Sequence, residues 1–162
     1  MKIGVVSDTH IPVSCCELPS QLLDALRGVD LILHAGDLVD LCVVDALEKI
    51  SKVEAVYGNM DPENVSSKLR NKIILDIEDR RIGLMHGRGR PDGLVDVLKA
   101  EFLKDKVDII VFGHSHAPFN KYIDGILFFN PGSATDDIYA PCKSCGIIEI
   151  SKGAVKSEII KL

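Results

Sequence analysis

The sequence has no surplus of positive charge. Its 19 lysine and arginine residues are outnumbered by 24 aspartate and glutamate residues, and the formal net charge is −5. Nucleic acids and anionic membranes are bound through basic faces, so both are disfavoured as partners of this chain. The acidic balance also argues against a nuclease.

A long apolar segment is missing as well. The first residues contain only the run IGVVS before Asp8 interrupts it. This run is too short for the apolar part of a signal peptide or for a membrane span. We therefore expect a cytoplasmic protein without a membrane partner.

Cysteines are few and do not form a disulfide pattern. An odd number of scattered thiols fits a reducing compartment. Only the last two form a CxxC pair, and a structural zinc site would need four ligands. The five residues are Cys15, Cys16, Cys42, Cys142 and Cys145.

Repeats, low-complexity stretches and Ser/Gly-rich linkers are also absent, so we expect a single domain over residues 1–162. Helical spacing of apolar residues occurs in the segments 18–28, 39–51 and 91–105. Short β-rich runs occupy residues 2–7, 30–34, 53–57, 72–77, 81–86, 108–112, 126–130, 146–150 and 156–162. This order predicts an α/β fold, with parallel strands covered by helices and antiparallel strands at the end of the chain.

Side chains able to bind metals follow five of these runs. The carboxyl ends of parallel strands share one edge of a sheet, where ligands bind, so we expect these side chains to converge. KIGVVS is followed by Asp8 and His10, DLILH by Asp37, VEAVY by Asn59 and Asp61, RIGLM by His86, and DIIVF by His114 and His116.

The donor types favour a particular chemistry. Carboxylate, amide and imidazole groups together suit manganese, iron, nickel, cobalt or zinc better than calcium. Without Asp61, the two aspartates, one asparagine and four histidines make seven donors, which are too many for one tetrahedral ion but serve two ions if one carboxylate bridges them. Two cations about 3.5 to 4 Å apart stabilise the attacking and leaving oxygens of a phosphoryl displacement. The predicted chemistry is therefore phosphoester hydrolysis.

The segment VFGHSHAP places two of these donors only two residues apart. In extended backbone, His114 and His116 would point to the same side of the chain. Gly113 would let the backbone turn, and Pro118 would end the segment.

The blocks SDTH, HAGDLVD, VYGNMD, MHG, GHSH and NPGS resemble, in this order, the motifs of the calcineurin-like metallophosphoesterase superfamily. The start SDTHIP is similar to that of its small prokaryotic single-domain phosphodiesterases. The resemblance covers Lys2 to about Ile150. It implies a four-layer αββα sandwich, in which two mixed β-sheets are flanked by helices, with a dinuclear metal centre at the strand ends.

The resemblance also implies a role for each donor. Asp8, His10 and His116 would hold the first metal; Asn59, His86 and His114 would hold the second; Asp37 would bridge them. A metal-bridging hydroxide would attack phosphorus in line. The expected cofactors are two divalent transition metal ions, manganese first, with nickel, cobalt, iron or zinc as alternatives. The expected substrate is a small phosphodiester.

Met60 departs from the family pattern. Many relatives have a histidine here that protonates the leaving group or holds the phosphate, and general-acid help typically supplies about 10² to 10⁴ in rate. Its absence predicts a preference for activated esters such as aryl phosphodiesters. Asp61 could substitute as an acid or could orient a neighbouring ligand. Arg88, in a glycine-rich loop with Arg90, could reach a substrate phosphate or remain solvated.

A second hypothesis is a non-catalytic scaffold. A retromer subunit shares the fold and has an impaired metal centre, and it works as a scaffold that binds other proteins. Intact donors favour the enzyme, whereas an exposed apolar patch away from the metal edge would favour the scaffold. The sequence leaves a homo-oligomer open. For His34 the sequence allows two roles, as a partner that orients Asp37 or as a hydrogen-bonded core histidine. For Ser133 it allows a place in the floor of the site or in a turn.

Overall fold

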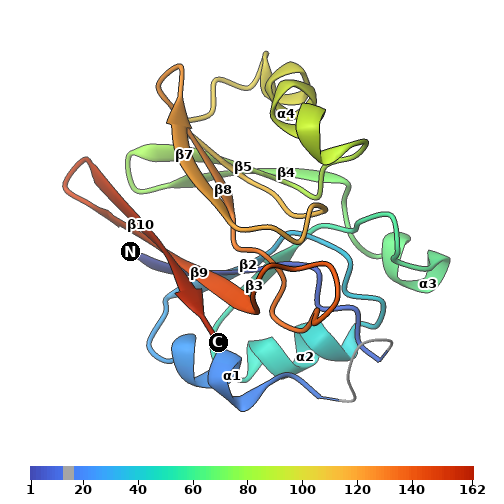
Figure 1. Cartoon of the computed structure of the whole chain (residues 1–162). Helices are drawn as coiled ribbons and strands as arrows, with labels where there is room; N and C mark the ends of the chain where they lie inside the picture. The colour runs from blue at the N-terminus through green and yellow to red at the C-terminus, as the bar shows by residue number, and fades with distance from the viewer. Residues whose placement is uncertain (13–16) are drawn as a thin grey trace.

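Two five-stranded β-sheets are stacked face to face, with helices on their outer sides (Figure 1). The computed structural model describes residues 1–12 and 17–162. The first sheet has the strand order β10-β9-β1-β2-β3, in which β1, β2 and β3 are parallel and β9 and β10 antiparallel to their neighbours. These strands are β1 (Lys2–Val6), β2 (Leu31–His34), β3 (Val53–Ala55), β9 (Ser144–Ser151) and β10 (Ala154–Lys161).

The second sheet has the order β4-β5-β6-β8-β7. Its three inner strands are parallel, and β4 and β7 pair antiparallel at the two edges, so both sheets are mixed. The strands are β4 (Lys72–Ile77), β5 (Arg80–Met85), β6 (Ile109–Val111), β7 (Phe119–Ile123) and β8 (Ile126–Asn130).

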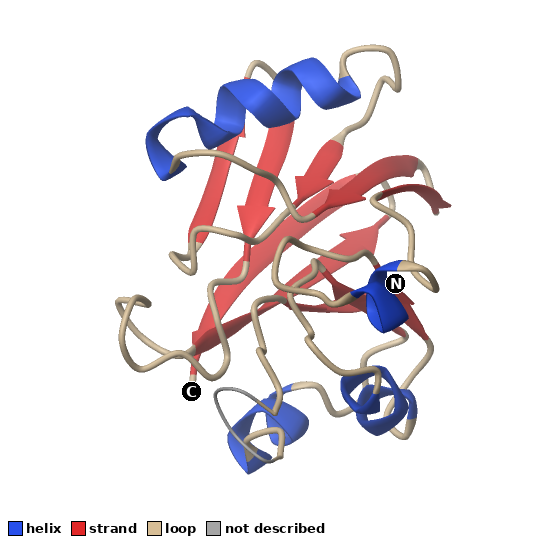
Figure 2. Cartoon of the chain, turned by 90° about the vertical axis from the view of Figure 1, so that its right-hand side faces the viewer, coloured by secondary structure: helices blue, strands red, loops and turns tan. Residues whose placement is uncertain are grey.

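Helices form the two outer layers, as the side view in Figure 2 shows. The first sheet is covered by α1 (Ser20–Ala25) and α2 (Cys42–Glu48), and the second by α4 (Leu94–Phe102), which follows the 3-10 turn η1 (Pro91–Gly93). The short helix α3 (Glu63–Ser66) lies to the side (Figure 1). Within the described residues, no helix has the length and apolar character needed to cross a membrane.

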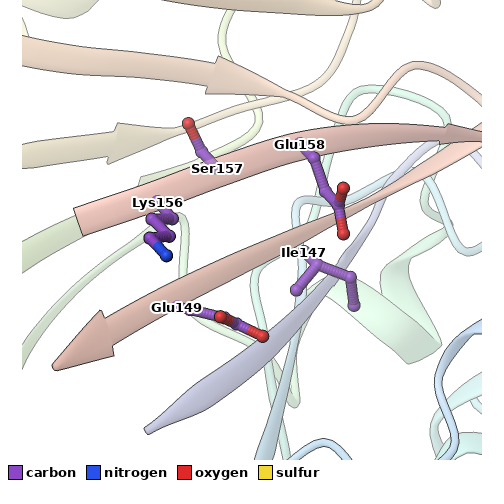
Figure 3. Close-up of a pocket in the computed structure, with 5 residues that line it drawn as sticks. All are labelled: Ile147, Glu149, Lys156, Ser157 and Glu158. Carbon is purple, nitrogen blue, oxygen red and sulfur yellow. The ribbon is translucent and has the colours of Figure 1, made fainter.

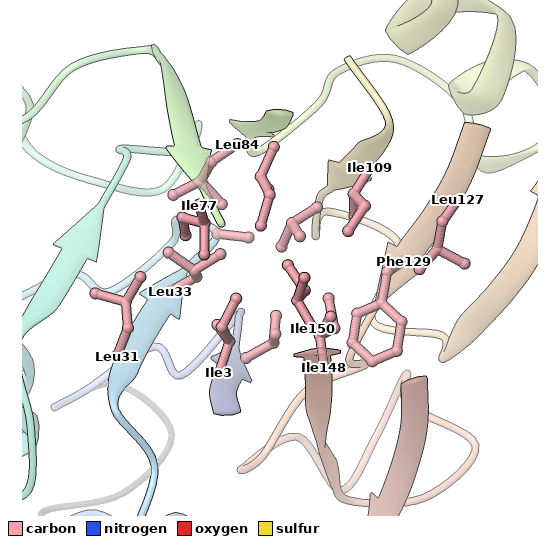
Figure 4. Close-up of a cluster of buried hydrophobic side chains, with 14 of the residues drawn as sticks. Ile3, Leu31, Leu33, Ile77, Leu84, Ile109, Leu127, Phe129, Ile148 and Ile150 are labelled. Atoms are coloured by element: carbon pink, nitrogen blue, oxygen red, sulfur yellow. The ribbon is translucent and has the colours of Figure 1, made fainter. Parts of the chain in front are cut away.

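The strands alternate between two apolar layers because successive side chains point to opposite faces of a sheet. In β1, Ile3 and Val5 belong to the cluster between the sheets (Figure 4), whereas Val6 packs with the residues under α1 and α2. In β5, Ile82 and Leu84 face the other sheet. Three apolar clusters thus separate four layers, and the predicted αββα arrangement is confirmed.

The predicted strands all appear, with ends that shift by up to two residues. Two elements were missed. The edge strand β7, FNKYI, has mostly exposed side chains and therefore no apolar alternation. The four-residue helix α3 is too short to show a helical period. Cys15 and Cys16 lie outside the described residues.

Candidate metal centre

The seven candidate ligands come together where strands of both sheets end. β1, β2 and β3 lead into Asp8, Asp37 and Asn59, and β5 and β6 of the other sheet lead into His86 and the GHSH loop. Asp8, Asp37 and His86 are buried, with exposed fractions of 0%, 2% and 1%. Burying two carboxylates side by side is costly unless positive charge accompanies them. The centre of the site is thus built for a cation.

One group of donors lies around Asp8 and His116. Asp8 Oδ1 is 3.3 Å from His116 Nε2 and 4.0 Å from His10 Nε2. The two imidazole Nε2 atoms are 3.2 Å apart. One ligand atom from each of these three residues lies within 4.8 Å of the others, which is close enough to share one metal ion.

A second group contains Asp8, Asp37 and His86, whose ligand atoms also lie within 4.8 Å of one another. His86 Nε2 is 3.2 Å from Asp37 Oδ2 and 3.9 Å from Asp8 Oδ1. The two groups share Asp8. Asp37 Oδ2 also lies 3.8 Å from His10 Nε2, so both carboxylates face both groups. Which carboxylate bridges two metals stays a prediction.

The imidazole of His86 provides a test of whether these residues fit a metal. Its Nδ1 donates a hydrogen bond to the Ala35 carbonyl at 2.7 Å, so in the neutral ring Nε2 carries the lone pair. Nε2 is buried and makes no hydrogen bond, because its approach to Asp37 lacks the required geometry. The lone pair of His86 Nε2 would repel the carboxylates of Asp37 and Asp8 that it faces. A cation bound between the imidazole and the carboxylates would remove this repulsion. The donor set therefore fits a divalent metal.

Asn59 and His114 lie beside this second group. His114 Nε2 donates to the Gly89 carbonyl at 2.8 Å, which leaves Nδ1 facing the Asn59 side-chain oxygen at 2.9 Å. The His114 ring meets the His86 ring edge-on, with centroids 5.3 Å apart. His116 therefore belongs to the first group, whereas His114 lies beside the second. That the two histidines bind different metals stays a prediction.

The backbone at the ligands is strained. Left-handed φ values are uncommon for residues other than glycine, and such strain concentrates at functional sites. The β-branched Val39, next to the site, has a φ of 71°. The values for the ligands are 53° at Asp8, 49° at His10, 56° at Asp37, 70° at His114 and 55° at His116. The expectation that the GHSH pair shares one side of an extended segment is thus wrong, since this loop is not extended.

Close packing of the loops depends on glycine. A Cβ at Gly113 would lie 1.9 Å from Ser7 Oγ and 2.6 Å from Asp8 Oδ2. Gly113 therefore lets the GHSH loop approach Asp8, rather than supplying a left-handed turn. The Asp8 carboxylate in turn accepts hydrogen bonds from the His114 backbone N–H at 3.1 and 3.2 Å.

The NPGS block, residues 130–133, forms hydrogen bonds to the loop that carries Asp8 and to the GHSH loop. Ser133 Oγ donates to the Asp8 carbonyl at 2.7 Å, which is the floor-closing role considered for it. The amide of Asn130 donates to the Gly113 carbonyl at 2.8 Å and to Ser115 Oγ at 3.1 Å. The block thus links the first and last ligand loops.

Asp136 is a site residue that the sequence did not indicate. His116 Nδ1 donates to Asp136 Oδ2 at 2.5 Å, so Nε2 is directed toward Asp8. Burial would raise the pKa of Asp136, but hydrogen bonds from His116 and from backbone N–H groups lower it to about 2. A carboxylate that holds the second nitrogen of a ligand histidine is a common feature of metal sites. No apolar strand ends at Asp136, so the strand-end pattern did not reveal it.

Asp61 lies beneath Asp37 and accepts three backbone hydrogen bonds. They come from Asp37 N at 3.0 Å, Val39 N at 2.6 Å and Gly58 N at 2.7 Å. Both carboxylate oxygens are engaged in holding the loop that carries Asp37. This arrangement favours the orienting role over the acid role.

Arg88 and His34 lie apart from the ligand groups. Arg88 Nη2 donates to Glu101 Oε1 at 2.6 Å, and its side chain is 69% exposed and does not line the pocket at the ligands. His34 is fully buried, accepts a hydrogen bond from Gly36 N and contacts Thr9 Oγ1 at 3.1 Å. Burial lowers the pKa of His34 to about 3. It is a neutral core histidine.

A pocket of about 500 Å³ opens over the ligands. It is lined by His10, Asp37, Asn59, Met60, Pro91, His114, Ser115, His116, Asp136, Ile138 and Tyr139. A separate hollow of about 180 Å³ lies on β9 and β10 (Figure 3), where Lys156 is paired opposite Glu149. Such cross-strand charge pairs are ordinary features of an exposed sheet face.

Comparison with known proteins identifies several relatives. Residues 1–153 match the family model of the calcineurin-like phosphoesterase superfamily domain. A probable metallophosphoesterase of Methanothermobacter thermautotrophicus is 42% identical over 135 residues, covering 83% of this chain and 78% of that protein. A phosphodiesterase of Methanocaldococcus jannaschii is 27% identical over 144 residues, covering 82% and 83%. The crystal structure of Vps29 from Entamoeba histolytica complexed with zinc is 29% identical, covers 99% of each chain and has a TM-score of 0.80.

Proposed function

Because the chain belongs to the calcineurin-like phosphoesterase superfamily, we propose that it is a metal-dependent phosphodiesterase with two divalent metal ions. The observation that carries the proposal is the pair of ligand groups that share the buried carboxylate of Asp8. One group would hold the first ion through Asp8, His10 and His116. The second ion would be held by Asn59, His86 and His114, with Asp37 between the two ions.

Bound divalent ions would supply Lewis-acid activation of the phosphate and of an attacking water. The chain's own residues prepare the site for this chemistry. Asp136 fixes the orientation of His116, and Asp61 fixes the loop of Asp37. We propose manganese as the metal, with nickel, cobalt, iron and zinc as alternatives, since imidazole and carboxylate ligands accept all of them.

The pocket wall supports a diester substrate with a good leaving group. Met60 lines the pocket where many relatives have a histidine, and a thioether donates no proton. Beyond the proposed metal ions, the described lining residues include no lysine or arginine to bind the second charge of a monoester. The name of the Methanocaldococcus relative points to the same substrate class.

The scaffold hypothesis rests on the likeness to Vps29. The scaffold hypothesis predicts an exposed apolar patch away from the sheet edge that carries the metal ligands. Of the six large apolar side chains that are exposed among the described residues, Met60, Ile138 and Tyr139 line the metal pocket. The other three, Met1, Leu103 and Tyr122, lie on or beside three different elements, β1, α4 and β7. This distribution favours the enzyme.

Hydrolysis of bis(4-nitrophenyl) phosphate tests the proposal. The chelated protein should be inactive and should regain activity with manganese, nickel, cobalt or zinc. Asp8→Asn should abolish activity, whereas Asp124→Asn, at an exposed carboxylate paired with Lys99, should not change it. Failure of all four metals to produce hydrolysis would overturn the proposal.

A further inference from the structure

The metal pocket has an apolar rim that the proposed chemistry does not use. Ile138 and Tyr139 are 81% and 80% exposed, and Met60 is 55% exposed. All three line the pocket over the ligands. Large apolar side chains left this exposed in a group commonly mark a binding surface. We call Met60, Ile138 and Tyr139 the apolar ledge.

The backbone of two ledge residues, Ile138 and Tyr139, is held by the same carboxylate that orients a metal ligand. Asp136 Oδ1 accepts hydrogen bonds from Ile138 N at 2.7 Å and Tyr139 N at 3.1 Å, while Oδ2 accepts from His116 Nδ1 at 2.5 Å. The Tyr139 ring stands edge-on to the His116 ring, with centroids 6.4 Å apart. The backbone that carries Ile138 and Tyr139 is therefore held next to the ligands before anything binds, which reduces the entropy lost on binding.

The charges of the pocket restrict what the ledge can accept. Its carboxylate lining residues are Asp37 and Asp136, and no lysine or arginine lines it among the described residues. Away from the proposed metal ions, a substituent carrying further phosphates or carboxylates would meet Asp136 and no basic side chain of the described lining. An uncharged, flat substituent would instead bury apolar surface against Tyr139 and Ile138.

We propose that the apolar ledge binds an uncharged aromatic substituent of a phosphodiester and so determines substrate specificity. The proposal rests on the phosphodiesterase function proposed above and narrows its substrate class. The volume of about 500 Å³ is in the range of pockets for small molecules, and its floor is the ligand cluster itself. A small ester, rather than a protein surface, fits both features.

Binding measurements test the ledge without relying on turnover. The monomethyl esters of phenylphosphonate and methylphosphonate, which carry one negative charge as a phosphodiester does, are titrated by calorimetry into the manganese-loaded protein. The wild type should bind the phenylphosphonate ester more tightly. Tyr139→Ala should reduce this preference about two- to ten-fold, as expected for one lost aromatic contact, with binding of the methylphosphonate ester unchanged. Tyr139→Phe should keep the preference.

A matched control is Tyr122→Ala, which removes another exposed tyrosine, on β7 outside the pocket. This variant should bind both phosphonates as the wild type does. In kinetics, 4-nitrophenyl phenyl phosphate and 4-nitrophenyl methyl phosphate share a leaving group and differ in the second substituent. Tyr139→Ala should raise KM for the phenyl ester more than for the methyl ester, with little change in kcat.

The outcomes separate the two proposals. If the wild type hydrolyses both diesters but Tyr139→Ala leaves the phenyl preference intact, the ledge proposal is wrong and the phosphodiesterase stands. If the phenylphosphonate ester is preferred but no diester is hydrolysed, the ledge stands and the proposed function fails. A change of oligomeric state in Tyr139→Ala with an unchanged phenyl preference would assign the ledge to a protein contact and overturn the proposal.

Discussion

Asp136 and His116 form a hydrogen-bonded pair in which Oδ2 of the carboxylate accepts from Nδ1 of the imidazole at 2.5 Å. The opposite nitrogen of His116 then faces Asp8 at 3.3 Å. Hydrogen bonds that His116 donates to the carboxylates of Asp8 and Asp136, opposed by burial, raise the pKa of His116 to about 9. The negative surroundings that favour a proton on His116 would also favour a metal cation at this position.

Removing the carboxylate of Asp136 should weaken metal binding. Asp136→Ala leaves the ring of His116 without its orienting partner, and losses of this kind typically cost about 10- to 100-fold in metal affinity. Competition with a chelating dye measures the affinity. The control is Asp137→Ala, which removes the neighbouring carboxylate, 75% exposed and paired with Lys143. Equal affinities for the two variants would contradict the assigned role of Asp136.

The sequence predicted the convergence of the ligands because the fold itself brings strand ends together. Asp8, Asp37 and His86 each follow an apolar strand, and parallel pairing leaves no other place for them. Asp136 was missed because it lies in a loop after β8 and acts through His116. Arg88 was considered as a phosphate-binding residue because a guanidinium group pairs well with phosphate. In the structure it pairs with Glu101 of α4, and the sequence alone does not show that the fold brings these two residues together.

The two histidines of the GHSH loop should affect different metal ions. His116 lies with Asp8 and His10, whereas His114 contacts Asn59 and the ring of His86. His116→Ala and His114→Ala should each lower the metal content from two ions to about one. Metal analysis after equilibrium dialysis measures the stoichiometry. Two ions tightly bound by both variants, with full activity, would contradict the ligand assignment.

Asp61 should act by positioning rather than as an acid. Asp61→Ala leaves the N–H groups of Asp37, Val39 and Gly58 without their acceptor, which should cost about 1 to 3 kcal/mol in the free energy of unfolding. It should also weaken metal binding, because the loop of Asp37 loses its support. Denaturation by urea and a metal titration measure the two effects.

Comparison of leaving groups separates the two roles of Asp61. If the residue positions the loop, Asp61→Asn should slow aryl and alkyl esters by the same factor and restore part of the metal affinity lost in Asp61→Ala. A loss confined to alkyl esters, with normal metal binding, would show that Asp61 protonates the leaving group.

Cys145 should make stability depend on alkaline pH. Its thiol is fully buried in β9, and burial raises the pKa to about 11 from the ordinary value of 9.0. Between these values the unfolded chain loses the thiol proton and the folded chain keeps it. The free energy of unfolding should therefore fall as pH rises from about 9 to 11, by at most about 1.4 kcal/mol per pH unit. Cys145→Val should show a shallower decline in urea unfolding, and an equal slope would refute the assignment.

Gly113→Ala tests whether the approach of the GHSH loop to Asp8 positions the metal ligands. The added Cβ would lie 1.9 Å from Ser7 Oγ and 2.6 Å from Asp8 Oδ2, so the loop must move away. Overpacking of this kind costs about 1 to 3 kcal/mol in stability. Because Asp8 belongs to both ligand groups, binding of both ions should weaken together.

Gly93→Ala is the matched control, since its Cβ would meet nothing within 4 Å and its φ of −118° suits alanine. Thermal unfolding and metal titration compare the two variants, and similar metal affinities would show that the close approach is dispensable.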